Sequence, residues 1–140
     1  MSHVYFTDRD LGKRFPESLR AAGVAVERHR DLFRHDAPDE EWLEHCGRHG
    51  RIALTHNLRI RYTPNELAAV RDHRVALIIL IGKAPLSQLA VNFVNSLSRI
   101  ESLVDSHEPP YVAKLYRPSP AEASRNSAHP GTITLWYPVK

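Results

Sequence analysis

Two aspartates lie two positions apart, directly after a short apolar run near the start of the chain. The run from Val4 to Thr7 is followed by Asp8 and Asp10. A buried strand would deliver both carboxylates to its carboxyl end, and this edge of an open α/β sheet is where ligands bind. Carboxylate oxygens are ligands that Mg²⁺ prefers. The alternative is that one aspartate simply caps the following helix, and the spacing alone favours neither interpretation.

Acids also gather where a helix is expected to start. Asp39, Glu40 and Glu41 follow a proline and precede Trp42. Proline in the first turn, and acids at the positive end of the helix dipole, are ordinary signals of a helix N-terminus. Taken alone, this structural role is favoured over a binding role for these acids.

A third polar group follows another short apolar strand, predicted at Ile52–Thr55. In an alternating α/β chain, the ends of the first and third strands and the start of the second helix can reach the same edge of the sheet. The candidate pocket then contains Asp8, Asp10, Asp39, Glu40, Thr55 and Asn57. Such a set suits one or two Mg²⁺ or Mn²⁺ ions, which could activate water and stabilise charge on a phosphodiester. Basic side chains on the rim would bind a nucleic-acid backbone, and we expect this role for Arg9, Lys13, Arg59 and Arg61.

Hydrophobic periodicity predicts the elements that would position these groups. Apolar runs predict strands at residues 3–7, 24–27, 52–55, 75–81 and 111–116, with the last at an edge of the sheet. Helical spacing predicts helices at residues 11–22, from 39 to Gly47 or Gly50, from 63 through 70, and at 85–107. The polar residues 29–38 predict a loop over one edge of the site. The alternation predicts a three-layer α/β/α domain with a central, mainly parallel five-stranded sheet.

The composition is that of one ordinary globular domain. The 140 residues are 42% hydrophobic and 25% charged, with a net charge of +3, which permits a nucleic-acid partner without requiring one. The longest apolar run, Val75 to Ile81, is far shorter than the roughly 20 residues that span a bilayer. The start of the chain lacks the apolar segment of a secretory signal, so we expect a cytoplasmic protein with no membrane partner. A single cysteine, Cys46, excludes an internal disulfide and a cysteine-based zinc site.

At three blocks the chain resembles the PIN-like domain superfamily, and most closely its branch of VapC-type toxins. The blocks are residues 6–11, 38–43 and 52–57, in matching order and spacing, and the likeness runs from about residue 3 to residue 117. It implies a Rossmann-like fold and a single-strand-specific, metal-dependent endoribonuclease. It also implies the toxin of a type II toxin–antitoxin pair, neutralised by a cognate antitoxin protein. By position, Asp8 corresponds to the first metal-binding aspartate, Asp39 to the helix acid with Glu40 as its substitute or helper, and Thr55 to the strand-end hydroxyl.

The chain departs from the family pattern after the third predicted strand. The pattern places an aspartate two residues after the threonine, often with another two residues further on, whereas this chain has Asn57 and Arg59. An asparagine can coordinate through its carbonyl oxygen without adding charge, and Arg59 would repel a cation while attracting phosphate. The catalytic set would be Asp8, Asp39, Thr55 and Asn57, with Asp10 and Glu40 as further metal ligands. Two functions remain open: an active ribonuclease, which the retained acids favour, and a degraded module that binds RNA or a protein partner without cleavage.

Three other functions have weaker support. A receiver-like signalling domain needs a phosphate-accepting aspartate at the end of the third strand, where this chain has Thr55, His56 and Asn57. For a zinc site, only His45 and His49 stand at helical spacing, without a third ligand nearby. The Gly-x-Ser-x-Gly turn of a serine hydrolase does not occur.

The amino-acid composition of the chain changes after residue 117. Residues 118–131 have the composition of a linker, and 132–137 resume a strand-like pattern. We therefore predict a PIN-like domain at 1–117 and a linker-like extension at 118–140. Residues 132–137 could add a strand to a sheet edge, dock on a partner or only close the chain. The amphipathic helix at 85–107 could form a homodimer, as the resemblance suggests, or be used entirely by the chain's own core.

Overall fold

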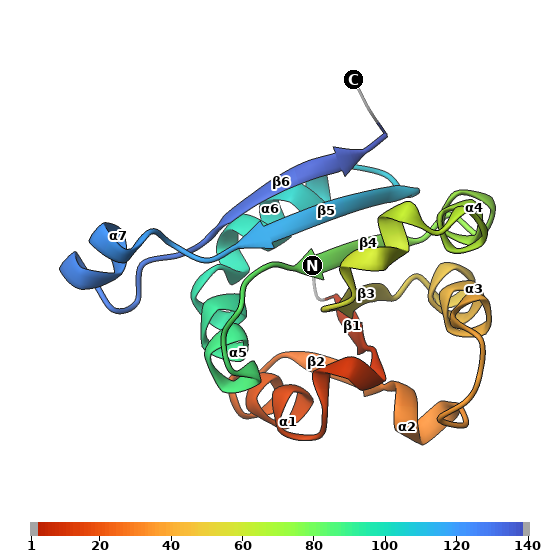
Figure 1. Cartoon of the computed structure of the whole chain (residues 1–140), viewed down its shortest axis with the longest axis horizontal. Helices are drawn as coiled ribbons and strands as arrows, with labels where there is room; N and C mark the ends of the chain where they lie inside the picture. The colour runs from red at the N-terminus through yellow and green to blue at the C-terminus, as the bar shows by residue number, and fades with distance from the viewer. Residues whose placement is uncertain (1–2, 139–140) are drawn as a thin grey trace.

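A six-stranded sheet in the order β2-β1-β3-β4-β5-β6 forms the centre of the computed structural model (Figure 1). The model describes residues 3–138, without the side chains of residues 61 and 62. The strands are β1 Val4–Thr7, β2 Ala25–Arg28, β3 Ile52–Thr55, β4 Ala76–Leu80, β5 Tyr111–Tyr116 and β6 Thr132–Tyr137. Neighbouring strands from β2 to β5 are parallel, and β6 is antiparallel to β5.

Helices cover both faces of this sheet, which confirms the predicted α/β/α architecture. They are α1 Arg14–Ala21, α2 His29–Leu32, α3 Asp39–His49, α4 Pro64–Asp72, α5 Leu86–Asn95, α6 Leu97–Ser106 and α7 Pro120–Arg125, with 3-10 turns η1 Arg9–Leu11 and η2 Leu58–Tyr62. One apolar cluster joins the sheet to α1, α5 and α6, and a second joins it to α3 and α4. In the part of the chain that the structure describes, no helix has the length and apolar character needed to cross a bilayer.

Side-chain alternation along the central strand explains the two clusters. In β4, Ile78 and Leu80 belong to one cluster, while Leu77 and Ile79 belong to the other. A strand covered by helices on both faces needs apolar side chains at every position, and all five residues of β4 are buried. This requirement accounts for the uninterrupted apolar run in the sequence.

Two of the predicted helices are interrupted. The helix expected at 11–22 is divided into η1 and α1 by Gly12, whose φ of 70° lies in the left-handed region that favours glycine. The helix expected at 85–107 is two helices, which meet at Ser96. The hydroxyl of Ser96 accepts a hydrogen bond from the Gly131 N–H at 2.7 Å, a contact with the end of the chain that helical periodicity does not reveal.

Two further predictions are corrected by tertiary structure. The segment expected to be an irregular loop at 29–38 begins with the short helix α2. The sheet has six strands instead of five, because β6 pairs with β5 along its whole length, so β5 is not an edge strand. The strand that the C-terminal extension could add is therefore present, and α7 precedes it. The domain boundary at residue 117 stays a prediction.

The strand order places a ligand-binding edge between β1 and β3. From β1 the chain passes to β2 on one side and then returns to β3 on the other. Such a reversal opens a crevice at the carboxyl ends of the two strands, and in doubly wound sheets this crevice binds the ligand. Thr7 pairs with Leu54 in register, so Asp8 and Thr55 are the next residues on each side of the crevice.

Candidate active site

The buried hydroxyl of Thr55 lies between two carboxylates. It is 2.9 Å from Asp8 Oδ2 and 3.2 Å from Asp10 Oδ2, and can donate its proton to either. The same oxygen accepts a hydrogen bond from the Asn57 N–H at 3.1 Å. Thr55 therefore holds the two aspartates together at the crevice, as the convergence of strand ends predicted.

Backbone groups complete the hydrogen bonding of both aspartates. The Arg9 N–H donates to Asp8 Oδ1 at 2.7 Å, so Asp8 caps η1. The His56 N–H donates to Asp10 Oδ2 at 3.1 Å. The sequence left open whether this aspartate caps a helical turn or belongs to a ligand site. In the structure one oxygen of Asp8 caps η1, and the other faces Thr55, so the two roles are compatible.

The electrostatics of this pair favour a bound proton or cation. Burial, followed by the charge of Asp10, raises the pKa of Asp8 to about 7, and the Thr55 hydrogen bond opposes this rise. Partial loss of water also raises the pKa of Asp10, against the hydrogen bonds from His56 and Thr55. A carboxylate whose ionised form is disfavoured in this way is stabilised by a positive charge placed nearby.

Asp39 supplies a third carboxylate from another element. It is the first residue of α3, and its Oδ1 accepts a hydrogen bond from Trp42 Nε1 at 3.0 Å. The Trp42 ring is itself fixed by stacking on Phe6 of β1, with centroids 5.6 Å apart. Asp8, Asp10 and Asp39 line one cavity of about 480 Å³, which we call the acidic cavity. The helix-start signal in the sequence was correct, and the helix starts at the site.

Two of the four basic residues predicted to bind nucleic acid line the acidic cavity. These are Arg9 and Arg59. Arg9 Nη2 donates to the Phe33 carbonyl at 2.9 Å, and its buried Nε has no partner among the described residues. Lys13 is exposed just before α1 and does not line the cavity. Arg61 belongs to η2, and its side chain lies outside the described residues.

Two predicted ligands have other surroundings. Glu40 lies in a separate surface depression, together with Glu44, His45 and Arg48. Asn57 lines the acidic cavity, but its Oδ1 accepts a hydrogen bond from the Arg59 N–H at 3.0 Å and so caps η2. The structure thus brings together Asp8, Asp10, Asp39, Thr55 and Asn57, and leaves Glu40 apart.

Glu66 is a neighbour of the site that sequence analysis missed. Burial raises its pKa, and the adjacent carboxyl of Asp39 raises it further. Its Oε2 is buried and has no hydrogen-bond partner in the described part of the chain. The only signal in the sequence was the position of this acid in the first turn of α4. An acid there is ordinary at a helix start, so it gave no reason to assign Glu66 to the site.

His29 is a second residue that sequence analysis missed. It is buried, lines the acidic cavity, and packs its ring against Phe6 and Phe33. Burial lowers the pKa of this imidazole, and the charge of Arg9 lowers it further. The neutral ring is therefore favoured at neutral pH. Its place in the segment expected to pass over the edge of the site was the available signal.

The donors suit a hard divalent cation in their chemistry. Asp8, Asp10 and Asp39 offer carboxylate oxygens, although residues 3–138 contain no cluster of three His, Cys, Asp or Glu side chains already arranged for a metal. Mg²⁺ keeps several waters and is usually held by one or two carboxylates together with substrate phosphates. The acidic cavity therefore fits an ion shared with a substrate better than an ion enclosed by protein alone.

Comparison with known proteins identifies the family. A family model described as a PIN-like domain matches residues 3–82, which include all the residues lining the acidic cavity. No curated protein and no solved structure matches the chain. Since the family match covers more than half of the sequence, the chain belongs to the PIN-like domain family, whose members are typically nucleases.

Proposed function

We propose that this protein is a divalent-metal-dependent endoribonuclease. The observation that carries the proposal is the acidic cavity, where Asp8, Asp10 and Asp39 face a space that Arg9 and Arg59 also line. Acids in this position suit the cation, and arginines suit the phosphates on either side of it. This combination is typical of enzymes that act on phosphate esters, nucleases among them.

The residues of the chain have distinct tasks in this function. Asp8 and Asp39 would hold the Mg²⁺ or Mn²⁺ ion, with Asp10 and Glu66 adding negative charge around it. The ion supplies activation of water and stabilisation of charge on the phosphodiester. Thr55 keeps Asp8 and Asp10 oriented through its hydroxyl. Arg9 and Arg59 would fix the RNA backbone, since guanidinium groups bind phosphate oxygens in pairs.

The biological role that we propose is that of a toxin in a type II toxin–antitoxin pair. Its support is the likeness of residues 6–11, 38–43 and 52–57 to VapC-type toxins. In that role the protein would cleave single-stranded RNA in the cytoplasm until a cognate antitoxin binds it. Induced expression should then arrest bacterial growth, and expression of Asp8→Asn at the same level should not. Equal arrest by both proteins would remove the toxin role.

A second candidate function is RNA binding without cleavage. The observation in its favour is that the Asn57 Oδ1 is engaged by the Arg59 N–H at 3.0 Å, where the family pattern expects a free acid. The site would then have three carboxylates in the acidic cavity and an arginine at its rim. Binding of RNA with no cutting at any metal would favour this candidate.

Cleavage of a mixed single-stranded RNA pool tests the two candidates. The native protein should cut with Mg²⁺ or Mn²⁺ and not with EDTA. Asp8→Asn should lower the rate at least about a hundredfold, because the buried ligand loses its charge at the ion. The matched control is Asp72→Asn, since Asp72 is an exposed aspartate paired with Arg71 on α4. Retained cleavage by Asp8→Asn would contradict the site assignment.

A further inference from the structure

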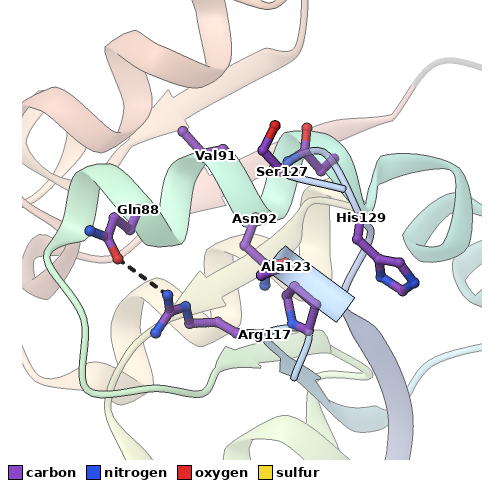
Figure 2. A pocket seen from close by; sticks show the side chains of 9 residues that line it. Gln88, Val91, Asn92, Arg117, Ala123, Ser127 and His129 are labelled. Atoms are coloured by element: carbon purple, nitrogen blue, oxygen red, sulfur yellow. Dashed lines mark hydrogen bonds between the residues drawn. The ribbon is translucent and has the colours of Figure 1, made fainter. Parts of the chain in front are cut away.

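A second cavity lies beyond the part of the chain that the family model matches. It has a volume of about 230 Å³ and lies between α5 and the segment around α7 (Figure 2). Its polar lining residues are Gln88, Asn92, Asn95, Arg117, Ser127 and His129, and the lining residues include no carboxylate. We call it the C-terminal cavity. Together with the apolar side chains of Val91, Pro118 and Ala123, these groups suit a ligand that has apolar faces and polar edges.

The wall of this cavity is fixed to the body of the domain. Besides its bond to Ser96, Gly131 accepts a hydrogen bond at its carbonyl from Arg99 Nη1 at 2.9 Å. A Cβ at Gly131 would collide with the Tyr116 carbonyl and crowd the Asn92 amide. The segment after α7 therefore packs directly on α5 and β5, and the cavity is a defined part of the fold.

A nitrogen-bearing side chain follows each of four adjacent parallel strands. Arg9 comes after β1, His56 after β3, Lys83 after β4 and Arg117 after β5. Because these strands are parallel neighbours, their carboxyl ends lie along one edge of the sheet. Three strand spacings correspond to about 14 Å. This edge, which we call the carboxyl edge, runs from the acidic cavity to the C-terminal cavity.

Direct contacts join the middle of this edge to the C-terminal cavity. His56 Nε2 lies 3.1 Å from the Gly82 carbonyl oxygen. A Cβ at Gly82 would lie 3.0 Å from Arg117 Cδ, so the Arg117 side chain passes over this glycine. Figure 2 shows the Arg117 guanidinium donating from Nη2 to Gln88 Oε1, at 3.2 Å, on the wall of the cavity. Positive charge thus continues past the end of β4.

We infer that the carboxyl edge and the C-terminal cavity form an extended binding site for single-stranded RNA, an inference that rests on the proposed ribonuclease function. One part of the strand occupies the acidic cavity, and its continuation follows Lys83 to Arg117. Arg117 binds a phosphate, and the C-terminal cavity receives a nucleotide base. The amide nitrogen of Gln88, the amide of Asn95 and the hydroxyl of Ser127 line this cavity and can meet the edge of an unstacked base, which is how proteins read single-stranded RNA.

The arrangement favours RNA over a protein segment as the occupant. Proteins that bind single strands combine a cationic track along the backbone with pockets or platforms for bases. Here the cations are spaced along one edge. The cavity at its end combines the apolar side chains of Val91, Pro118 and Ala123 with polar groups, and its described lining residues include no carboxylate. A nucleotide base has apolar faces and polar edges and so matches this mixed surface, whereas an uncharged peptide would make no use of the row of cations.

Length-dependent RNA binding tests the inference. Binding is measured in the Asp8→Asn background, with labelled single-stranded RNA of 2 and 12 nucleotides at several salt concentrations. Arg117→Gln should raise the Kd of the 12-nucleotide RNA about fivefold and lower its salt slope by about 0.7, because one phosphate contact is lost. The 2-nucleotide RNA has a single internal phosphate and cannot reach from one cavity to the other, so its Kd should not change. Ala123→Trp, which fills the cavity without altering charge, should weaken only the longer RNA and keep its salt slope.

The control is a basic residue beside the cavity that points elsewhere. Arg125 is exposed on α7, and its Nε donates to the Ala121 carbonyl of the same helix at 3.4 Å. If Arg125→Gln weakens binding as much as Arg117→Gln, or if both RNA lengths respond equally, the inference is overturned. It is also overturned if neither RNA binds. Length-dependent binding through Arg117 by a protein that never cuts RNA would support the inference while refuting the proposed cleavage.

Discussion

The acidic cavity and the C-terminal cavity lie at two ends of one sheet edge and differ in how their polar groups are satisfied. In the acidic cavity, burial raises the pKa values of Asp8 and Asp10, and the charge of a neighbouring carboxylate, Asp10 for the first and Asp39 for the second, raises each further. At the C-terminal cavity, Asn92 and Ser96 bond to each other and to the chain around them. The first arrangement is electrostatically unfavourable when empty, and the second is stable without a ligand.

This difference separates chemistry from binding in physical terms. Clustered carboxylates lower the stability of the folded protein, and they persist where a cation or proton compensates them. A cavity whose amide and hydroxyl groups are hydrogen-bonded, and whose arginine, Arg117, donates to Gln88, needs no such compensation and can be added at the periphery of a domain. The family match ends at residue 82, so the unfavourable cavity lies in the shared part of the fold and the satisfied one lies outside it.

The largest effect is expected from Asp8→Asn on the stability of metal-free protein. The pKa of Asp8 is raised from its usual value near 4 to about 7 on folding. The folded state therefore binds this proton more tightly than the unfolded state, and native stability falls as pH rises through this window. Asparagine does not titrate. The variant should be more stable than the native protein by about 4 kcal/mol at pH 8, and nearly equal to it at pH 4.

Thermal unfolding in EDTA from pH 4 to pH 8 measures this effect. Asp31→Asn is the control, because Arg28 holds the pKa of exposed Asp31 below its usual range. That pair contributes above the unfolded pKa of the aspartate, so its loss should not raise the Tm at pH 8. Added Mg²⁺ should raise the Tm of the native protein more than that of Asp8→Asn. An Asp8→Asn variant no more stable than native protein at pH 8 would mean that Asp8 carries no unfavourable charge.

Local sequence signals were sufficient for three of the elements around the acidic cavity, β1, β3 and the start of α3, but not for the short helix α2. Apolar runs located β1 and β3, and a proline followed by acids located the start of α3. These elements are specified by residues close together in the chain. The convergence of Asp8, Asp39 and Thr55 then followed from parallel topology alone, because the ends of neighbouring strands share one edge.

Contacts between distant residues were beyond sequence reasoning. Nothing in the periodicity of residues 85–107 shows that Ser96 meets Gly131, so the break between α5 and α6 was missed. Glu66 reaches Asp39 only because α4 packs beside α3. A contact between distant residues also explains why Glu40 lies outside the acidic cavity. Trp42 packs on Phe6 and so sets the rotation of α3 about its axis. One position along a helix turns a side chain by about 100°.

A smaller effect is expected from Thr55→Val. Valine keeps the shape but removes the hydroxyl that faces Asp8 and Asp10 and accepts from the Asn57 N–H. Unpaired buried groups should lower the free energy of unfolding by about 2 kcal/mol. The pKa of Asp8 should rise further, since the hydrogen bond that lowers it is lost. The free energy of unfolding in urea and the rate of RNA cleavage should both fall. Thr55→Ser should restore most of each. Equal behaviour of Val and Ser would show that the hydroxyl is unimportant.

The smallest effect is expected at the other end of the edge, from Ser96→Ala. Its hydroxyl donates to Asn92 Oδ1 at 3.3 Å and accepts from the Gly131 N–H at 2.7 Å, and all these partners are neutral. The free energy of unfolding should fall by about 1 kcal/mol, because neutral groups left unpaired are penalised less than charged ones. Hydrogen exchange at Gly131 should accelerate, while its rate at Thr55 should stay unchanged.

Ser98→Ala is the control, since Ser98 is an exposed serine two residues away on α6. Cleavage of a 2-nucleotide RNA should survive Ser96→Ala, whereas binding of a 12-nucleotide RNA should weaken as the wall of the C-terminal cavity loosens. If instead the short RNA were cut more slowly, the two cavities would be coupled through α5, and the division between chemistry and binding would fail.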